Sequence, residues 1–322
     1  PFIMNISVLG CGRWGSFIAW YLNKIQNNVT LYGRKSSEKV QSLIKTRKNA
    51  ILQFNKEINI TTDLKDAIDF GEIIIISIGS QHLRQLIEEI KPVISKEKII
   101  VLCMKGIETK SLKRLSQVVF EYLPENPCAI WVGPGHVQEF ADGVPNCMVI
   151  DSQSKKITKF LADSFSSDLI RFYYGEDLIG SEIGAASKNV IGIAAGMLDG
   201  FKLSSLKGAL MARGTSEIAR LIHKMGGEQM SAYGLCHLGD YEATVFSKHS
   251  HNRMFGEAFI LKQPYDELAE GAYTVKALIQ LGKQYDVDLP ICKTVYNILY
   301  TDADPKIELN KLFSRSTKPE FY

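Results

Sequence analysis

A glycine-rich motif near the start of the chain constrains its fold more than any other feature. Residues 10–15 form a G-x-G-x-x-G pattern that directly follows an apolar run at residues 6–9 and opens a stretch with helical spacing. In such a pattern Gly10 permits a tight turn, Gly12 lets the backbone approach a diphosphate, and Gly15 lets helix and strand pack closely. The helix N-terminus adds free amides and partial positive charge. The motif therefore predicts a dinucleotide-binding βαβ unit rather than a plain strand-to-helix turn.

Apolar runs alternate with amphipathic stretches through the first half of the chain. Predicted strands lie at residues 6–9, 29–32, 73–78, 99–104, 129–132, 147–150 and 169–174, and predicted helices include residues 14–25, 81–90 and 111–122. This alternation indicates a parallel sheet with helices on both faces. After about Gly175 long helical periods take over, as at residues 179–198, 207–225 and 274–284. We therefore predict an α/β Rossmann-type dinucleotide-binding domain over residues 1–175 and an all-α substrate domain over residues 176–322.

Composition narrows the class of protein. The chain has 38 Lys and Arg against 35 Asp and Glu, and because the net charge of +3 is spread along the sequence, no nucleic-acid partner is expected. A hydrophobic content of 45% excludes bulk disorder, and the apolar runs are too short to span a membrane. Six cysteines without CxxC spacing are typical of reduced thiols. The first residues do not resemble a leader peptide, so a cytoplasmic protein is expected.

The end of the second predicted strand bears on the choice of cofactor. A site that prefers NAD usually has Asp or Glu at this point to bind the ribose hydroxyls. Here the strand is followed by Gly33, Arg34 and Lys35, and the first acid is Glu38. Because the two cations would attract a 2′-phosphate, NADP(H) is the predicted cofactor, with NAD(H) as the alternative. A solvated basic turn would have the same sequence.

Two lysines are candidates for catalysis. Lys105 comes directly after a predicted strand, where ligands of open α/β sheets bind, although a surface lysine could also stand there. Lys188 lies within a helical stretch of Gly, Ala, Ile and Val. Burial would lower the pKa of its amine toward the range that is useful for proton transfer, unless the side chain extends to solvent. Lys188 is therefore the predicted general acid and base.

Polar side chains gather in two further segments. Asp240 ends a glycine-punctuated loop, and residues 247–253 combine hydroxyl, imidazole, amide and cationic groups that suit a phosphate monoester. The histidines at 237, 249 and 251 match no metal-binding spacing, so no metal is predicted. His136, in a second strand-to-helix turn, is either a ligand or a packing residue.

In combination these segments resemble the bacterial NAD(P)-dependent glycerol-3-phosphate dehydrogenases, from near residue 4 to about residue 300. The matching segments follow one another in the family's order, at residues 9–15, 104–108, 133–136, 188–197, 212–214, 238–240, 252–256 and 270–271. The resemblance implies a Rossmann-type domain joined to an α-helical substrate domain, usually in a cytoplasmic homodimer. It also implies the reversible reduction of dihydroxyacetone phosphate to sn-glycerol 3-phosphate, which supplies glycerophospholipid synthesis.

The resemblance assigns roles to individual residues. Lys188 would be the proton donor or acceptor. The residues at the cofactor would be Gly10, Gly12, Arg13, Trp14, Gly15, Arg34, Lys35, Lys105, Val137, His251 and Glu270. The residues at the substrate would be Lys105, Gly133, Gly135, Lys188, Asp240, Ser250, His251 and Asn252.

Four positions depart from the family pattern. Gly135 replaces a usual Ser or Thr, and His251 replaces an arginine. Residues 201–208 lack the usual asparagine, although Lys207 could supply the usual cation, and Ala269 replaces a branched aliphatic residue. Arginine is always charged, whereas histidine ordinarily titrates near ~6.5. An anion held by His251 would therefore bind less tightly as the pH rises.

Two other interpretations stay open from the sequence. A two-domain reductase of the β-hydroxyacid or ketopantoate type would also have a G-x-G-x-x-G motif and a lysine on a helix, but it would act on a carboxylate. A homologue that binds NADP(H) without catalysis would fit the departures at Gly135 and His251. Oxidation of NADPH in the presence of dihydroxyacetone phosphate distinguishes the three.

Overall fold

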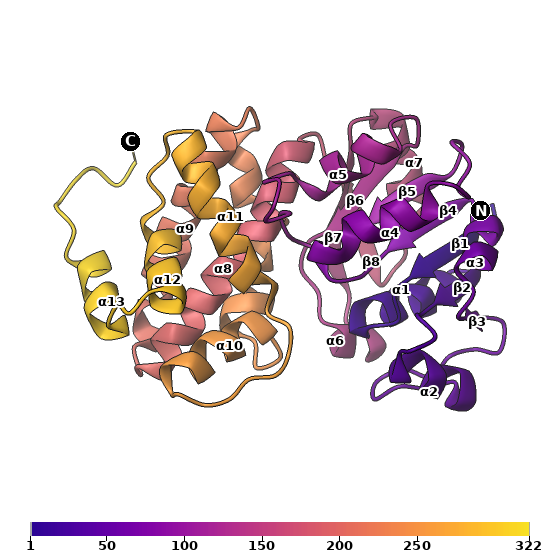
Figure 1. The fold of residues 1–322 in the computed structure, drawn as a ribbon, viewed down its shortest axis with the longest axis horizontal. Helices are drawn as coiled ribbons and strands as arrows, with labels where there is room; N and C mark the ends of the chain where they lie inside the picture. Colours follow the sequence, from indigo (N-terminus) through magenta and orange to yellow (C-terminus); the bar gives the residue numbers. More distant parts are fainter. Residues whose placement is uncertain (1, 322) are drawn as a thin grey trace. The chain divides into compact units, whose positions relative to one another are not determined.

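The computed structural model describes residues 2–321, which form two compact units. The first unit contains the chain up to Met104 together with Leu115–Leu178, and the second contains Lys105–Arg114 and the chain from Ile179 onward. In Figure 1 the strands lie in the indigo-to-magenta part of the chain, whereas the orange-to-yellow part is helical. This architecture confirms the predicted fold class.

The first unit is built on one eight-stranded sheet with the order β3-β2-β1-β4-β5-β6-β7-β8. The strands are β1 (Asn5–Leu9), β2 (Asn28–Tyr32), β3 (Asn59–Thr61), β4 (Ile73–Ile76), β5 (Ile99–Leu102), β6 (Cys128–Val132), β7 (Asn146–Ser152) and β8 (Ile170–Tyr174). Neighbouring strands are parallel except β6 and β7, which are antiparallel. The order of the first six strands is typical of dinucleotide-binding folds.

Strand composition explains most of the sheet. β4 consists of four isoleucines that are all buried, as expected for a strand covered on both faces. Each predicted strand corresponds to one in the structure, but β3 has no apolar run that would predict it. The antiparallel direction of β7 corrects the expected wholly parallel sheet. The connection from β6 contains the five-residue helix α6 (Val137–Ala141), so a helix between two strands does not by itself make them parallel.

The other helices of the first unit connect the remaining strands. They are α1 (Arg13–Lys24), α2 (Glu38–Thr46), α3 (Leu64–Phe70), α4 (Leu83–Ile90), α5 (Leu115–Tyr122) and α7 (Lys155–Phe165). Helix α1 buries Phe17, Tyr21 and Leu22 in the same apolar core as the strand residues Val8 and Leu31. Phe17 and Tyr21 are four positions apart and Leu22 is next to Tyr21, so all three lie on one face of the helix, which is the pattern that predicts it.

The second unit is a bundle of helices. They are α8 (Leu178–Gly200), α9 (Lys207–Lys224), α10 (His251–Ile260), α11 (Glu270–Gln284), α12 (Pro290–Tyr300) and α13 (Pro305–Phe313). Helix α8 has 23 residues, and residues 180–198 within it are all buried. A helix that is apolar on every side lies inside its domain. Lys188 is therefore a cation within a buried, mainly apolar helix.

One short segment differs from the predicted domain division. A single boundary at residue 175 assigns Lys105–Arg114 to the first domain, but this segment groups with the second unit. Ile107 is fully buried in the apolar core of the second unit, and Arg114 forms a buried ion pair with Glu182 of α8. These contacts join residues that are distant in the sequence, so no local pattern reveals them. They bring Lys105 into the second unit.

Within residues 2–321 no helix is long and apolar enough to cross a membrane. The same residues contain no group of three or more His, Cys, Asp or Glu side chains that could hold a metal ion. Four of the six cysteines, at 103, 128, 236 and 292, are buried.

Candidate active site

The three glycines of the glycine-rich loop differ in how much space surrounds them. Gly10 has a φ of +119°, and a Cβ atom there would lie 2.0 Å from the carbonyl oxygen of Ser77. A Cβ at Gly15 would lie 2.0 Å from the carbonyl oxygen of Gly10. By contrast, no atom lies within 4 Å of a Cβ built at Gly12. Packing therefore requires the first and third glycines, whereas the second faces open space that a ligand could enter.

The start of α1 fits an anionic ligand. Gly12 is the N-cap of α1 and has no side chain that could accept from the first amides of the helix. Among the residues that the structure describes, the first turn of α1 contains no acid. The amides and the positive end of the helix are therefore available to a diphosphate. Arg13 is exposed, and half-buried Trp14 packs on Phe17 with a centroid distance of 5.0 Å. These observations fit a dinucleotide diphosphate at this loop.

The turn after β2 lies beside the glycine-rich loop. A Cβ at Gly33 would lie 2.6 Å from both Cys11 Sγ and Val40 Cβ, so only glycine allows this close approach. The next two residues, Arg34 and Lys35, are exposed. Two cations thus follow a residue that contacts the loop, which is where a phosphate on the adenosine ribose would need partners.

Three charged side chains meet in the second unit. Lys188 of α8 and Lys105 each place Nζ 2.7 Å from the same oxygen, Oδ2 of Asp240. Asp240 ends a short 3₁₀ turn, η4 (Leu238–Asp240), and its side chain is 2% exposed. The side chain of Lys188 is 9% exposed and that of Lys105 is 21% exposed. One buried carboxylate therefore serves two lysines of unequal exposure.

The electrostatics of this cluster make Lys188 titrate in a useful range. Burial lowers the pKa of the Lys188 amine to about 7, and the positive charge of Lys105 lowers it as well, while Asp240 opposes both by stabilising the ammonium. Thr244, in the π-helical turn η5 (Glu242–Phe246), accepts a hydrogen bond of 2.7 Å from Lys188 Nζ. Near neutral pH both protonation states of Lys188 are accessible, as general acid–base catalysis requires.

Three further predicted substrate residues lie at the start of α10. Ser250 is its N-cap and accepts from the amide of Arg253. His251 Nδ1 lies 2.6 Å from the hydroxyl oxygen of Tyr265. Asn252 Oδ1 accepts a bond of 2.9 Å from the amide of Gly271.

Two glycines, Gly192 of α8 and Gly271 of α11, allow the start of α10 and the start of α11 to pack closely against α8. A Cβ at Gly192, one turn after Lys188, would lie 2.6 Å from Thr244 Cγ2 and 3.3 Å from Asn252 Cβ. Gly271 follows Glu270, the first residue of α11, and a Cβ there would lie 2.7 Å from the carbonyl oxygen of Asn189. The polar start of α10 and the start of α11 are thus packed against the part of α8 that bears Lys188.

Comparison with known proteins identifies the family. A family model for the N-terminus of NAD-dependent glycerol-3-phosphate dehydrogenase matches residues 5–158, and a model for the C-terminus of the same family matches residues 177–310. The chain belongs to this family. A glycerol-3-phosphate dehydrogenase, NAD(P)+, of Thermoanaerobacter sp. (strain X514) is 35% identical over 99% of both chains. Another, of Fusobacterium nucleatum, is also 35% identical over 99% of both chains.

A solved structure agrees with this assignment. The crystal structure of glycerol-3-phosphate dehydrogenase from Coxiella burnetii matches with a TM-score of 0.91 at 29% sequence identity, covering 98% of this chain and 100% of that one. The resemblance predicted from the motifs is thereby confirmed. As a member of the glycerol-3-phosphate dehydrogenase family, the chain is an NAD(P)-dependent oxidoreductase.

The packing around position 135, where a departure from the family pattern is expected, leaves no room for a larger side chain. The turn after β6 has Gly133 at φ +125° and Gly135 at φ +151°, both in the region that favours glycine. A Cβ at Gly135 would also lie 2.3 Å from Cε2 of Phe140, whose ring stacks on Phe17 with a centroid distance of 5.1 Å. The Phe140 ring therefore occupies the space that a serine side chain would need. Val137, at the start of α6, is buried.

The cation at Lys207 is already engaged within the protein. Lys207 is 6% exposed, and its Nζ donates to Asp199 Oδ2 at 2.7 Å and to the carbonyl oxygen of Val245 at 2.9 Å. Arg253 also bonds Asp199 Oδ2, at 3.0 Å. Lys207 thus ties the start of α9 to α8 and to the segment after Asp240. Ala269, the other small departure, is the buried N-cap of α11.

Some residues at the site have only weak sequence signals. Thr244 follows Asp240 by four positions, a spacing that brings two side chains together only if the segment is helical. His237 and Tyr241, also four positions apart, bond to each other at 2.6 Å. The glycines at 234 and 239 suggest a loop, so this helical spacing does not stand out from the sequence.

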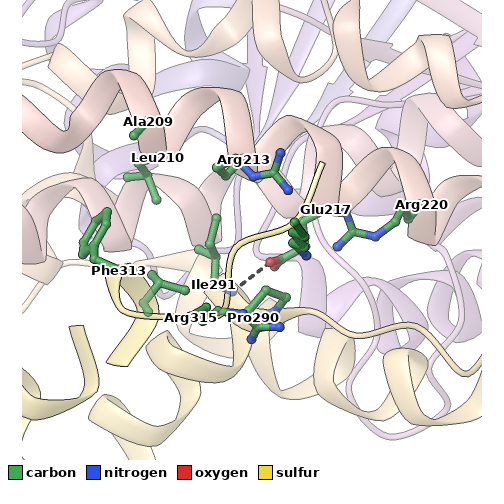
Figure 2. A pocket seen from close by; sticks show the side chains of 11 residues that line it. Ala209, Leu210, Arg213, Glu217, Arg220, Pro290, Ile291, Phe313 and Arg315 are labelled. Atoms are coloured by element: carbon green, nitrogen blue, oxygen red, sulfur yellow. Dashed lines mark hydrogen bonds between the residues drawn. The ribbon is translucent and has the colours of Figure 1, made fainter. Parts of the chain in front are cut away.

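A separate cavity of about 180 Å³ in the second unit is lined by residues of α9, α12 and α13 and by Arg315 and Lys318. Figure 2 shows Glu217 of α9 pointing toward Ile291 at the start of α12. The Glu217 carboxylate accepts bonds of 2.8 Å and 3.0 Å from the amides of Ile291 and Cys292. Burial raises the pKa of Glu217 to about 7. None of the predicted site residues lines this cavity, and Glu217 acts there as a cap for α12.

Proposed function

We propose that the protein catalyses the reversible reduction of dihydroxyacetone phosphate to sn-glycerol 3-phosphate, with Lys188 as the proton donor in reduction and the acceptor in oxidation. The observation that carries this proposal is that buried Lys188 and half-buried Lys105 contact the same oxygen of buried Asp240, in a member of the glycerol-3-phosphate dehydrogenase family. A bound nicotinamide would supply the hydride to the ketone carbon. The protein's task is then to manage the charge on the oxygen.

Lys188 suits that task because the pKa of its amine, about 7, allows it both to donate and to accept a proton near neutral pH. As negative charge develops on the carbonyl oxygen, the Lys188 ammonium stabilises it and delivers a proton. In the reverse direction the neutral amine accepts the proton from the alcohol. Burial, with a smaller effect of Lys105, keeps the pKa of Lys188 below an ordinary lysine value, and Asp240 keeps the ammonium populated. Lys105, the more exposed of the two lysines, would bind the substrate phosphate or oxygen.

Binding of the phosphate would orient the distant carbonyl. By family resemblance, Ser250, His251 and Asn252 would contribute from α10, with Gly133 and Gly135 as further substrate contacts. A hydroxyl, an imidazole and an amide at a helix start suit a phosphate monoester. A ketopantoate-type reductase would instead require a carboxylate substrate.

We also propose a preference for NADP(H) over NAD(H). Arg34 and Lys35 follow β2 where an NAD-specific site usually has an acid. Both are exposed, and they come directly after Gly33, which lies against Cys11 of the glycine-rich loop. Gly10, Gly12, Arg13, Trp14 and Gly15 would hold the diphosphate, with Val137 and Glu270 as further cofactor contacts. His251 and Lys105 are candidates to approach both ligands.

The decisive experiment compares Lys188→Ala with the unaltered protein. Oxidation of NADPH with dihydroxyacetone phosphate should lose ~10²–10⁴-fold in kcat, because general acid–base catalysis is lost, while NADPH binding measured by fluorescence titration is retained. Lys98→Ala is the matched control, since Lys98 is a half-buried lysine of the first unit with a lowered pKa and three carbonyl partners. It should reduce stability and leave kcat unchanged.

Near-wild-type turnover of Lys188→Ala would refute the assignment of Lys188. No turnover by the unaltered protein would favour a homologue without catalysis, and turnover of ketopantoate or a β-keto acid instead would favour the carboxylate reductases.

Arg34→Ala and Lys35→Ala test the cofactor preference. Each should raise the KM for NADPH by about 10-fold to 100-fold, the range expected for losing a charge-assisted hydrogen bond, and leave the KM for NADH nearly constant. An equal or better kcat/KM with NADH in the unaltered protein would overturn the preference.

The family resemblance further leads us to propose a homodimer that acts in the cytoplasm and supplies glycerophospholipid synthesis. Sedimentation equilibrium of the purified protein tests the subunit number. A monomer mass that does not change with concentration would contradict the dimer.

A further inference from the structure

His237 makes two hydrogen bonds inside the second unit, where its side chain is fully buried. Its Nδ1 lies 2.8 Å from the carbonyl oxygen of Gly184, and its Nε2 lies 2.6 Å from the hydroxyl oxygen of Tyr241. A carbonyl oxygen only accepts, so Nδ1 carries the proton and donates. Nε2 then has only a lone pair, and Tyr241 must donate to it. The two contacts therefore fix one neutral tautomer of His237.

The side chain and the main chain of His237 both bond residues close to the lysine site. Gly184 lies one helical turn before Lys188, and in an α-helix its carbonyl also accepts the amide of Lys188. The carbonyl oxygen of His237 accepts the amide of Asp240 at 3.0 Å. Asp240 in turn accepts from Thr244 through its main-chain oxygen at 2.8 Å. The side chain of His237 thus joins α8 to the segment that supplies both partners of Lys188.

We infer that His237 and Tyr241 are positioning residues that hold Asp240 and Thr244 against Lys188. This inference rests on the proposed role of Lys188 and assigns no contact with the substrate or the cofactor. Its basis is geometric, because the segment from His237 to Thr244 has no strand or long helix of its own to fix it.

The packing around this pair supports a dedicated role. A Cβ at Gly184 would lie 2.9 Å from Cys236 Sγ and 3.3 Å from His237 Cβ. A Cβ at Gly214 of α9 would lie 3.3 Å from the Tyr241 hydroxyl oxygen. Glycines on two helices thus leave the space that the pair occupies. The Thr215 hydroxyl lies 3.3 Å from that of Tyr241 and anchors it to α9.

His237 contributes geometry rather than charge. Burial lowers its pKa to about 4, so the ring is neutral throughout the usual assay range. The charged groups that act on Lys188 are Asp240, which raises its pKa, and Lys105, which lowers it. If the segment moves, the stabilising effect of Asp240 weakens first. The pKa of Lys188 should then fall further.

His237→Ala and Tyr241→Phe test this inference through the pH dependence of dihydroxyacetone phosphate reduction. Reduction uses the ammonium form of Lys188, so kcat falls as the pH rises above its pKa. In both variants we expect the alkaline limb to move to lower pH by at least about half a unit and kcat at neutral pH to fall by about 10-fold to 100-fold. The KM for NADPH should stay constant.

His237→Asn is the rescue variant. An asparagine amide can replace Nδ1 as the donor to Gly184 but has no equivalent of Nε2. It should therefore recover part of the pH profile that His237→Ala loses. Tyr21→Phe is the matched control for Tyr241→Phe, because Tyr21 is a fully buried tyrosine of the first unit whose hydroxyl bonds Phe165 and Ser167. It should lower the melting temperature without moving the pH profile.

The outcomes separate this inference from the proposed function. If Lys188→Ala loses turnover while His237→Ala and Tyr241→Phe keep the wild-type kcat and pH profile, the positioning role is wrong and the function of Lys188 stands. If the two variants only lose stability, as is expected of Tyr21→Phe, the pair is merely structural and the positioning role is wrong. If Lys188→Ala keeps its turnover, the proposed catalytic role fails first.

Discussion

The glycine-rich loop of the first unit and the lysine site of the second unit are constructed in opposite ways. The loop consists of backbone, and its function depends on atoms that are missing at Gly10, Gly12 and Gly15. The lysine site consists of side chains that come from distant parts of the sequence, since Lys105 and Asp240 are 135 positions apart. Adding atoms should therefore destroy the first site, whereas removing atoms or charge should destroy the second.

The difference also determines how each site tolerates change. A backbone loop has a single shape, so an extra methyl group either fits or forces the chain to move. A cluster of charges responds gradually, because the pKa of each group depends on its distance from the others. The loop should thus fail abruptly, and the lysine site should shift its pH dependence before it fails.

The largest effect is expected from one extra methyl group at Gly10. Gly10→Ala must adopt a φ of +119° with Cβ 2.0 Å from the Ser77 carbonyl oxygen, so β1, the loop and β4 cannot keep their positions. We expect loss of measurable NADPH binding and little folded protein, as judged by thermal unfolding. The identical change at Gly12 meets no atom within 4 Å. Gly12→Ala should therefore unfold within about 2 °C of the unaltered protein yet bind NADPH much more weakly.

If Gly10→Ala and Gly12→Ala behave alike, the two glycines do not have the different roles that the packing assigns to them. Normal NADPH binding by Gly12→Ala would show that the backbone at this glycine does not approach the cofactor. A stable and active Gly10→Ala would contradict the packing of the loop against Ser77.

The next largest effect is expected from removing a charge at the lysine site. Asp240→Asn keeps the size of the side chain but leaves Lys105 and Lys188 facing each other without a carboxylate. Because Asp240 stabilises the Lys188 ammonium, its loss should move the pKa of Lys188 below about 7. Reduction of dihydroxyacetone phosphate should fall by about 100-fold at pH 7.5 and recover partly toward pH 6. An unchanged pH profile would contradict the coupling between the two groups.

Much of the loop and little of the lysine site follow from the sequence alone, for a physical reason. The strand at β1, the helix at α1 and the three glycines are local patterns, so spacing alone predicts them. The burial of Lys188 can be inferred from its small apolar neighbours. Its pairing with Asp240 and Thr244 cannot, because it depends on how helices pack. The same holds for Lys105, whose short segment joins the second unit through contacts with α8 and the apolar core.

The turn at Gly135 lies between these extremes. The sequence predicts a departure from the family pattern here, but only the structure shows that the ring of Phe140 fills the space beside the turn. The two residues are only five positions apart, yet the contact depends on the start of α6 and on the aromatic packing around Phe17. A local pattern thus identifies the change, and only the packing explains it.

The smallest effect on activity is expected from Glu217, which tests whether a buried titratable group with a pKa near neutrality is enough to mark a catalytic site. Like Lys188, Glu217 is buried and has a pKa of about 7, but it is raised from 4.5 and its partners are amides at the start of α12. The folded protein therefore binds this proton more tightly than the unfolded chain. The stability contributed by the protonated acid is complete below pH 4.5 and is lost as the pH rises to about 7.

Glu217→Gln removes that titration and keeps one oxygen as an acceptor. Between pH 5 and pH 8 the unaltered protein should lose on the order of 1–3 kcal/mol more stability than the variant, measured by urea unfolding at each pH. Other titrating groups are common to both proteins and cancel in the difference. The kcat and KM of the variant should match those of the unaltered protein. If stability depends on pH equally in both proteins, the pKa of Glu217 is not raised. If the variant loses kcat, the cap on α12 affects the lysine site, and Glu217 is not purely structural.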